Sequence, residues 1–274
     1  MLSLLRPIRK KGGGDNMAKN QRGGRRGGGA SGGLPTGYAS NAPVNARPLT
    51  DAEADRLRNQ QDSAYDASTT AAVKMYISRT DFDGQNHSLS QTMNYLLDEG
   101  VDLNSADLGS VNSQYGLSLT PRDWASLQYT NNYMAAAMHP IGQDVELQRG
   151  AHDDLLRNTF GINDYSRYSE SQLQAMLVVQ AFRNTAPMST SYDINKNPFL
   201  SASSGSGVSG GREVVYRIKA GAKTRMLFGA KAQSEIILAA GTDWKITNVR
   251  YTGNTATPRG QRSRPQIEIS IETP

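Results

Sequence analysis

The residues best suited to chemistry lie in three short groups along this 274-residue chain. The first group is Arg149-Gly150, at the end of a predicted strand. Its planar guanidinium can bind a phosphate bidentately, and the glycine lets a ligand approach the backbone. The second group is Ser189-Thr190-Ser191. Because side chains alternate along a strand, we expect Ser189 and Ser191 on one face, where a hydroxyl can orient a catalytic group, and Thr190 on the other.

The third group is Gln233-Ser234-Glu235, which enters the apolar run Ile236-Ile237-Leu238. A carboxylate beside a sugar stabilises the positive charge that develops when a glycosidic bond breaks, so Glu235 is the strongest catalytic candidate. Gln233 lies two residues earlier, which predicts that it shares the strand face of Glu235 and points toward an incoming nucleophile. For each group the alternative is structural: a strand-end arginine, exposed strand hydroxyls, and a glutamine that fills a loop.

Several other kinds of catalytic site are excluded by the sequence. The chain has no cysteine, which excludes disulfides, thiolate metal ligands and cysteine nucleophiles. Its three histidines are scattered, so we expect no metal site and no histidine-based triad. Walker, G-x-G-x-x-G, G-x-S-x-G and H-E-x-x-H patterns are missing. No apolar run approaches the roughly 18 residues that span a membrane, and residues 1–5 are too short for a signal sequence.

The elements that must position these groups form an α+β pattern, with helices first and strands later. Over residues 49–142, Thr50 to Glu53 is a capping-box pattern, and Thr120-Pro121 begins a later helix that ends before Pro140. A short strand at 144–148 and a helix at 168–183 follow. The remaining strands are predicted from β-branched runs at 214–218, 235–238, 244–249 and 266–271.

The charge of the chain is unevenly distributed. Residues 1–48 hold nine of the 30 basic residues and one of the 25 acidic residues, so they carry a net +8 and the rest of the chain carries −3. Residues 12–33 contain ten glycines and almost no apolar side chain. This composition predicts a disordered basic tail over residues 1–48, which is either an electrostatic arm for nucleic acid or a solubilising linker.

In order and spacing, the three groups resemble the R-S-E class of mono-ADP-ribosyltransferases. The resemblance rests on Leu147-Gln148-Arg149-Gly150, on Ala186-Pro187-Met188-Ser189-Thr190-Ser191, and on residues 228–238. The last stretch has the Q-x-E pattern of clostridial Rho-modifying exoenzymes and of similar phage and bacterial ADP-ribosyltransferase domains. In addition, Ala72-Val73-Lys74-Met75-Tyr76 stands where family members carry an aromatic helix. The resemblance covers residues 60–250.

The resemblance implies a fold and a co-substrate. A catalytic domain would span residues 49–274, with a helical part at 49–142 and a β-rich core at 143–274. The core would consist of two small, roughly perpendicular sheets that flank a cleft for NAD. No metal is implied, because the chemistry of this family does not use one.

The resemblance also implies a role for each site residue. Arg149, beside Gly150, would bind the NAD phosphates, Ser189 would position Glu235, and Gln233 would present the acceptor. Weaker candidates complete the set: Thr190, Ser191, Phe199 and Arg217 for NAD, and Phe228 for acceptor recognition. Phe199 either stacks on the nicotinamide ring or anchors a loop. Phe228 lies five residues before Gln233, farther than is usual in the family.

We therefore predict a glycosyltransferase that moves ADP-ribose from NAD to a macromolecule, at a protein amide side chain or a nucleic-acid base, and releases nicotinamide. The chain would be a bacterial or phage effector or toxin that acts in the cytoplasm, with delivery into another cell as an alternative. Residues 1–48 would bind nucleic acid, and no membrane partner is expected. Two other functions stay open: a non-catalytic nucleic-acid-binding or virion-associated protein with a degenerate fold of this kind, and an NAD glycohydrolase.

Overall fold

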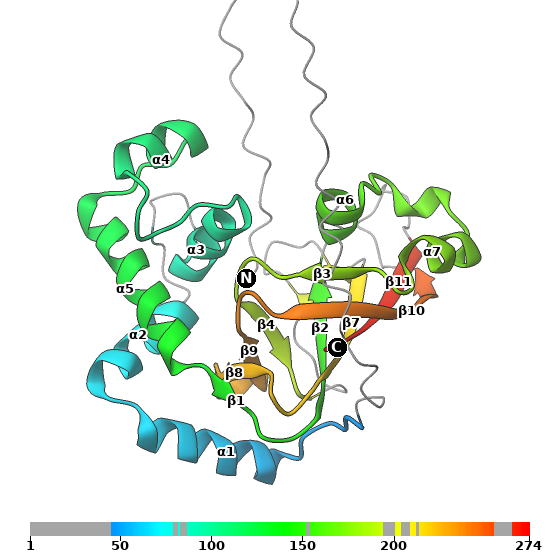
Figure 1. Ribbon diagram of the computed structural model, residues 1–274, viewed down its shortest axis with the longest axis horizontal. Helices are drawn as coiled ribbons and strands as arrows, with labels where there is room; N and C mark the ends of the chain where they lie inside the picture. Colours follow the sequence, from blue (N-terminus) through cyan, green and yellow to red (C-terminus); the bar gives the residue numbers. More distant parts are fainter. Residues whose placement is uncertain are drawn as a thin grey trace, which may run out of the picture.

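The computed structural model describes residues 45–78, 82, 87–151, 154–193, 201–203, 209–211, 214–254 and 265–274. Figure 1 shows α2 to α5 gathered at one end of a sheet and α6 and α7 at the other end, with α1 running along the bottom of the view near β1 and β8. Of the predicted tail, only residues 45–48 lie within the described part. Arg47 forms an isolated parallel bridge with Val145, so the predicted boundary at residue 48 is too late and these last residues belong to the folded domain.

Local sequence signals set where the helices begin. α1 (Asp51–Ala64) starts with the predicted capping box: Thr50 Oγ1 accepts from the Glu53 N–H at 3.3 Å, and the Glu53 carboxylate accepts from the Thr50 N–H at 2.9 Å. Thr120 and Asp123 repeat this arrangement at α5 (Pro121–Ala137). The other helices are α2 (Ala67–Ile77), α3 (Leu89–Asp98), α4 (Leu108–Tyr115), α6 (Asp154–Phe160) and α7 (Glu170–Leu177). None of the described helices is both long and apolar enough to cross a membrane.

The helix predicted at residues 168–183 is shorter in the structure. A 3-10 turn, η1 (Tyr165–Arg167), precedes α7, and α7 ends at Leu177. Val179 then adopts a φ of +71° and donates its N–H to Ile246 O at 2.9 Å. Residues Ala181–Arg183 form strand β3 beside β10, so pairing at the sheet edge replaces the expected end of the helix.

Nine strands of the described chain form one hydrogen-bonded sheet in the order β1-β8-β9-β4-β2-β7-β11-β10-β3. Only β7 and β11 run parallel, and every other neighbouring pair is antiparallel. A separate two-stranded sheet joins β5 (Ser201–Ser203) and β6 (Ser209–Gly211). The bounds of the nine are β1 (His139–Pro140), β2 (Val145–Ala151), β3 (Ala181–Arg183), β4 (Met188–Ser191), β7 (Val214–Ala220), β8 (Arg225–Phe228), β9 (Glu235–Leu238), β10 (Asp243–Asn254) and β11 (Pro265–Glu272).

The resemblance implied two separate, roughly perpendicular sheets, but in the described residues the two groups of strands form one hydrogen-bonded sheet, which narrows at a single joint. Among the described residues, β2 and β4 share a single registered pair, Gln148 with Ser191, whereas β2 and β7 are paired along the whole of β2. This joint lies between the strands β1-β8-β9-β4 and the strands β2-β7-β11-β10-β3. The hydrogen bonds across it make the two groups one continuous sheet. The α+β class is confirmed, and Arg149 and the Ser189–Ser191 run lie at the joint.

Two hydrophobic clusters hold the sheet on its two sides. One packs the larger group of strands, with residues of α1, β8 and β9, against α6, α7 and η1, and Leu156, Tyr165 and Leu173 are buried in it. The other packs helices α2 to α5 against β8 and β9, where Leu227 and Ile237 face the helices. β9 is buried on both faces, which is why its sequence is a continuous apolar run rather than an alternating one.

Candidate active site

Arg149 lies at the joint between the two groups of strands. Its Nη1 donates to the Ser189 carbonyl oxygen at 2.8 Å, the one hydrogen bond of its side chain among the described residues. Burial lowers the pKa of the Arg149 guanidinium, while the fields of Tyr76 and Glu235 act in the opposite direction. An arginine keeps its charge under any physiological condition. The remaining guanidinium N–H groups are therefore available to an anion.

Glu235 begins β9 and is held by the segment that precedes it. The Ala230 N–H donates to Glu235 Oε2 at 2.8 Å, and the side chain is almost fully buried, at 6% exposure. A Cβ at Gly229 would lie only 2.3 Å from the same Oε2. Only glycine fits beneath this carboxylate, so the position of Glu235 depends directly on the backbone at residue 229.

The Ser189–Ser191 run pairs with β9 residue by residue. Ser191 is opposite Glu235, Thr190 is opposite Ile236, and Ser189 is opposite Ile237. Directly opposed residues share a face, so Ser189 and Ser191 lie on the face of Glu235, as the alternation predicts. Ser189, which is half-buried, does not lie directly opposite the carboxylate that it was expected to position.

Two hydroxyls of this run form hydrogen bonds with backbone groups. Thr190 is fully buried, and its Oγ1 donates to Ile236 O at 2.7 Å. Ser191 is also fully buried, and its Oγ accepts from the Asp193 N–H at 3.2 Å. The prediction that Thr190 and Ser191 bind NAD is not supported, because both side chains are fully buried and hydrogen-bond to the backbone of the strand and of the turn after it.

Tyr76 of α2 is a site residue whose role the sequence did not reveal. Burial raises its pKa to about 12, and among the other groups that act on it are Ser189, Arg149 and Glu235. Its hydroxyl accepts from Asn94 Nδ2 at 3.0 Å. The helix face around Ala72 and Tyr76 signalled a packed helix, but the sequence could not show that the tyrosine hydroxyl reaches the joint.

Gln233 differs from its prediction. It ends a 3-10 turn, η2 (Lys231–Gln233), and Ser234 then adopts a left-handed conformation with a φ of +50° before β9 begins. Gln233 therefore does not share a strand face with Glu235. It lines a cavity of about 350 Å³ between α1 and the end of β4, together with Asp51, Asp55, Tyr192, Asp193, Lys231, Ala232 and Ser234.

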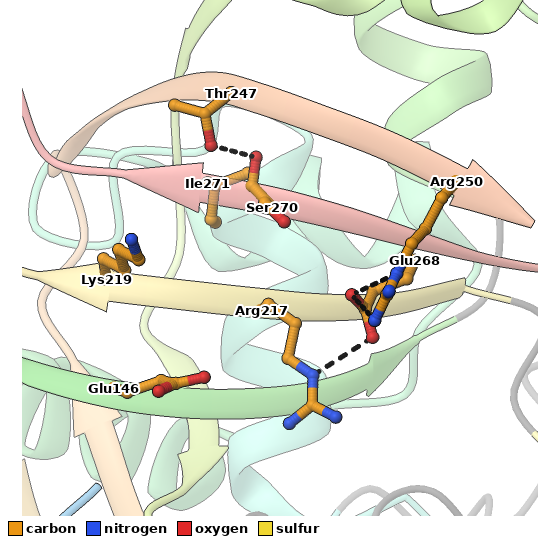
Figure 2. Close-up of a pocket in the computed structure, with 8 residues that line it drawn as sticks. All are labelled: Glu146, Arg217, Lys219, Thr247, Arg250, Glu268, Ser270 and Ile271. Atoms are coloured by element: carbon orange, nitrogen blue, oxygen red, sulfur yellow. Dashed lines mark hydrogen bonds and ion pairs between the residues drawn. The ribbon is translucent and has the colours of Figure 1, made fainter. Parts of the chain in front are cut away.

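Arg217 lies on the other face of the sheet from Arg149. In the register of β2 and β7, Arg149 is opposite Tyr216, and Arg217 is opposite Gln148. Arg217 Nε instead contacts Glu268 Oε2 at 3.1 Å, and Arg250 contacts the same carboxylate (Figure 2). The structure does not support the prediction that Arg217 binds a phosphate of NAD, because Arg217 and Arg149 point to opposite faces of the sheet.

Three predicted site residues remain: Phe228, Gly150 and Phe199. Phe228 is buried at 6% exposure beneath the guanidinium of Arg58, so it is not placed to recognise an acceptor. Gly150 is half-buried on β2 opposite Val215. Phe199 lies outside the described residues. Within the described part of the chain no group of three or more histidine, aspartate or glutamate residues could hold a metal ion.

Comparison with known proteins shows the fold. No family model matches the sequence, and no curated protein matches it in sequence either. The enzymatic component C2-I of the C2 toxin from Clostridium botulinum matches with a TM-score of 0.54 and 14% identity over 82% of this chain and 48% of that chain. The C3 exoenzyme of Clostridium limosum matches with a TM-score of 0.51 and 14% identity over 84% of this chain and 97% of that chain.

A third match is a shorter ADP-ribosyltransferase from Clostridium botulinum, with a TM-score of 0.50 and 15% identity over 82% of this chain and 96% of that chain. The present chain thus spans about half the length of C2-I and nearly the whole of the other two proteins. At these identities the likeness shows that this chain has the ADP-ribosyltransferase fold.

Proposed function

Starting from this fold, we propose that the protein is a mono-ADP-ribosyltransferase that transfers ADP-ribose from NAD to a macromolecule and releases nicotinamide. The observation that supports the proposal most is the meeting of Arg149, Ser189 and Glu235 at the joint between β2, β4 and β9. A cation for the phosphates and a carboxylate for the sugar are the two charges that this reaction needs.

Each charge has a separate task in the proposed reaction. Arg149 binds a phosphate of NAD through the N–H groups that it does not use on Ser189. The bond between the ribose carbon and the nicotinamide nitrogen breaks, and its electron pair leaves with nicotinamide. Glu235, held by the Ala230 N–H, stabilises the positive charge that develops on the ribose. The acceptor then forms a new bond to that carbon and gives up a proton.

We propose that the acceptor is a protein amide side chain or a nucleic-acid base. Gln233 lines the cavity between α1 and the end of β4, and its amide can pair with another amide or with a guanine edge. The proposal extends to an effector or toxin of a bacterium or phage that acts in a cell's cytoplasm. Residues 1–44 hold eight basic residues and one acidic residue, a charge that would bring the enzyme to nucleic acid.

The test is incubation of the purified protein with NAD labelled on the adenylate, in the presence of bacterial lysate. We expect label on a macromolecule, with mass spectrometry of protein and nucleic acid identifying the acceptor. The matched control is Glu235→Gln, which keeps the size of the side chain and removes its charge. Equal labelling by both proteins would overturn the assignment.

The same assay separates the other two functions. Nicotinamide release without any labelled macromolecule indicates an NAD glycohydrolase. Nucleic-acid binding by a peptide of residues 1–48, together with no NAD turnover by the full chain, indicates a non-catalytic protein with this fold.

A further inference from the structure

Helix α1 contacts the segment that leads into Glu235, and Figure 1 shows it running beside β8. Arg58 Nη1 donates to the Gly229 carbonyl oxygen, and the guanidinium lies 5.1 Å from the centroid of the Phe228 ring. Gln61, one turn later, accepts from the Phe228 N–H at 2.7 Å and donates to the Phe228 oxygen at 3.3 Å. α1 therefore fixes the backbone at the end of β8, through residues more than 160 positions away in the sequence.

One peptide group connects Arg58 to Glu235. The Gly229 carbonyl and the Ala230 N–H belong to the same planar unit. Arg58 donates to its carbonyl end, and its N–H end donates to Glu235 Oε2 at 2.8 Å. A cation at the carbonyl polarises the peptide and strengthens the hydrogen bond at the other end, because hydrogen bonds in a chain reinforce one another.

The carboxylate is sensitive to any movement of this peptide. Glu235 Oε2 lies where a Cβ at residue 229 would otherwise be, at 2.3 Å. The Gly229 N–H also donates to the Glu235 carbonyl oxygen at 3.0 Å. A rotation of the Gly229–Ala230 peptide would therefore displace the carboxylate as well as lose its donor.

Stability alone does not require an arginine at position 58. Its Nε and Nη2 atoms are buried and have no hydrogen-bond partner among the described residues. Unsatisfied buried donors are unfavourable, and an apolar side chain of similar length could pack on Phe228 without that cost. We infer that the arginine has a role beyond packing, and within the described residues its side chain forms one hydrogen bond, to the Gly229 carbonyl oxygen.

We propose that Arg58 is a positioning residue for Glu235 and acts through the Gly229–Ala230 peptide. This inference rests on the proposed function, because it takes Glu235 as the catalytic carboxylate. Arg58 itself touches neither NAD nor the acceptor. Its contribution is to hold the carboxylate in the orientation that faces the ribose.

Three variants of the full chain test this role. Arg58→Met keeps the length and apolar contact of the side chain but removes its donors. Arg58→Lys keeps the charge and one donor nitrogen and should restore part of the function. Arg56→Met is the matched control, because Arg56 lies exposed on the same helix and is not in contact with the 228–235 segment in any described interaction.

Two measurements are made on each variant. The first is backbone amide hydrogen exchange of residues 228–235, which does not depend on activity. We expect exchange about tenfold faster in Arg58→Met, with Arg58→Lys intermediate and Arg56→Met unchanged. The second is nicotinamide release. We expect kcat to fall about tenfold to a hundredfold in Arg58→Met, with Arg58→Lys intermediate, since small misplacements of a reacting group have effects of this size. KM for NAD and the stoichiometry of NAD binding should stay unchanged.

These outcomes distinguish the inference from the proposed function. If the wild-type protein releases no nicotinamide, the proposed function fails, and the exchange series alone decides whether Arg58 holds the segment. If the wild type is active and Arg58→Met has wild-type kcat or wild-type exchange, the inference is overturned. Should Arg58→Met fail to fold, Arg58→Lys decides in the same way, and wild-type values for both measurements would overturn the role.

Discussion

The sheet carries two arginine–glutamate arrangements, and their charges are unpaired in one and paired in the other. At the joint, Arg149 donates to the Ser189 carbonyl and Glu235 accepts from the Ala230 N–H. In the described part of the chain, neither of these two side chains forms an ion pair. Glu268, by contrast, lies between Arg217 and Arg250, with contacts of 3.1 Å and 2.8 Å, as Figure 2 shows.

The difference separates a stabilising arrangement from one that can react. When an arginine binds a carboxylate directly, each charge satisfies the other, and little remains for a ligand. When backbone groups hold a cation and a carboxylate apart, both charges stay available, and a substrate with phosphates and a cationic transition state can use both. The joint has the second arrangement, which is why we assign the chemistry there.

The largest effect that the comparison predicts is for Glu235→Gln against Glu268→Gln. We expect Glu235→Gln to lower kcat for nicotinamide release by at least about a hundredfold, since it removes the charge that stabilises the transition state. Glu268→Gln should leave kcat within about twofold and lower the free energy of unfolding by about 1–3 kcal/mol, because two arginines lose a charged partner. Kinetics and denaturant unfolding of both variants check this, and a reversed pattern would exchange the roles of the two arrangements.

The next largest effect is expected for Gly229→Ala. The added methyl would meet Glu235 Oε2 at 2.3 Å, so the carboxylate must move. We expect kcat to fall about tenfold to a hundredfold, from a displacement of the reacting group. The control adds the same methyl at Gly109, where the nearest atom is a rotatable Asp107 oxygen at 3.2 Å, and its kcat should not change. Wild-type turnover by Gly229→Ala would show that the position of Glu235 does not matter.

Local patterns in the sequence predicted the features that depend on neighbouring residues. The capping box at Thr50 and the helix start at Thr120 are where the sequence places them, because these side chains satisfy the same free N–H groups in any context. The shared face of Ser189 and Ser191 follows equally from strand alternation. The motifs around Arg149 and Glu235 were also sufficient to indicate the fold.

Features that depend on long-range register or on turn geometry were not predictable. The face of Arg217 is set by its pairing with Gln148, and a shift of one residue would have turned it toward the side of Arg149. Gln233 was placed on a strand because spacing alone does not reveal the left-handed Ser234 that precedes β9. Arg58 was not singled out, because its contact with Gly229 joins residues 171 positions apart.

A smaller effect distinguishes the two arginines. We expect Arg149→Lys to raise KM for NAD about tenfold, because an ammonium cannot form the bidentate contact of a guanidinium with phosphate. Arg217→Lys should leave KM for NAD unchanged, since Arg217 lies on the other face and contacts Glu268. Steady-state kinetics with varied NAD measure both. Equal increases in KM would mean that NAD reaches both faces of the sheet, contrary to the assignment.

The smallest effect concerns Tyr76, which is within the field of both Arg149 and Glu235, and whose pKa burial raises to about 12. Below pH 10 the tyrosine is neutral in both the folded and the unfolded chain, so its contribution to stability is complete. Between pH 10 and 12 only the unfolded chain releases the proton, and stability falls as pH rises. This group should account for a loss of about 2 kcal/mol over that interval, at about 1.4 kcal/mol per pH unit.

Tyr76→Phe removes that titration, so denaturant unfolding at pH 9 and pH 11.5 should show a smaller loss of stability in the variant than in the wild type. The difference between the two losses isolates Tyr76, because every other titrating group is common to both proteins. Parallel losses would mean that the hydroxyl is open to water in solution. The joint would then be a hydrated surface. Burial could then no longer explain why the unpaired charges of Arg149 and Glu235 differ from the paired charges around Glu268.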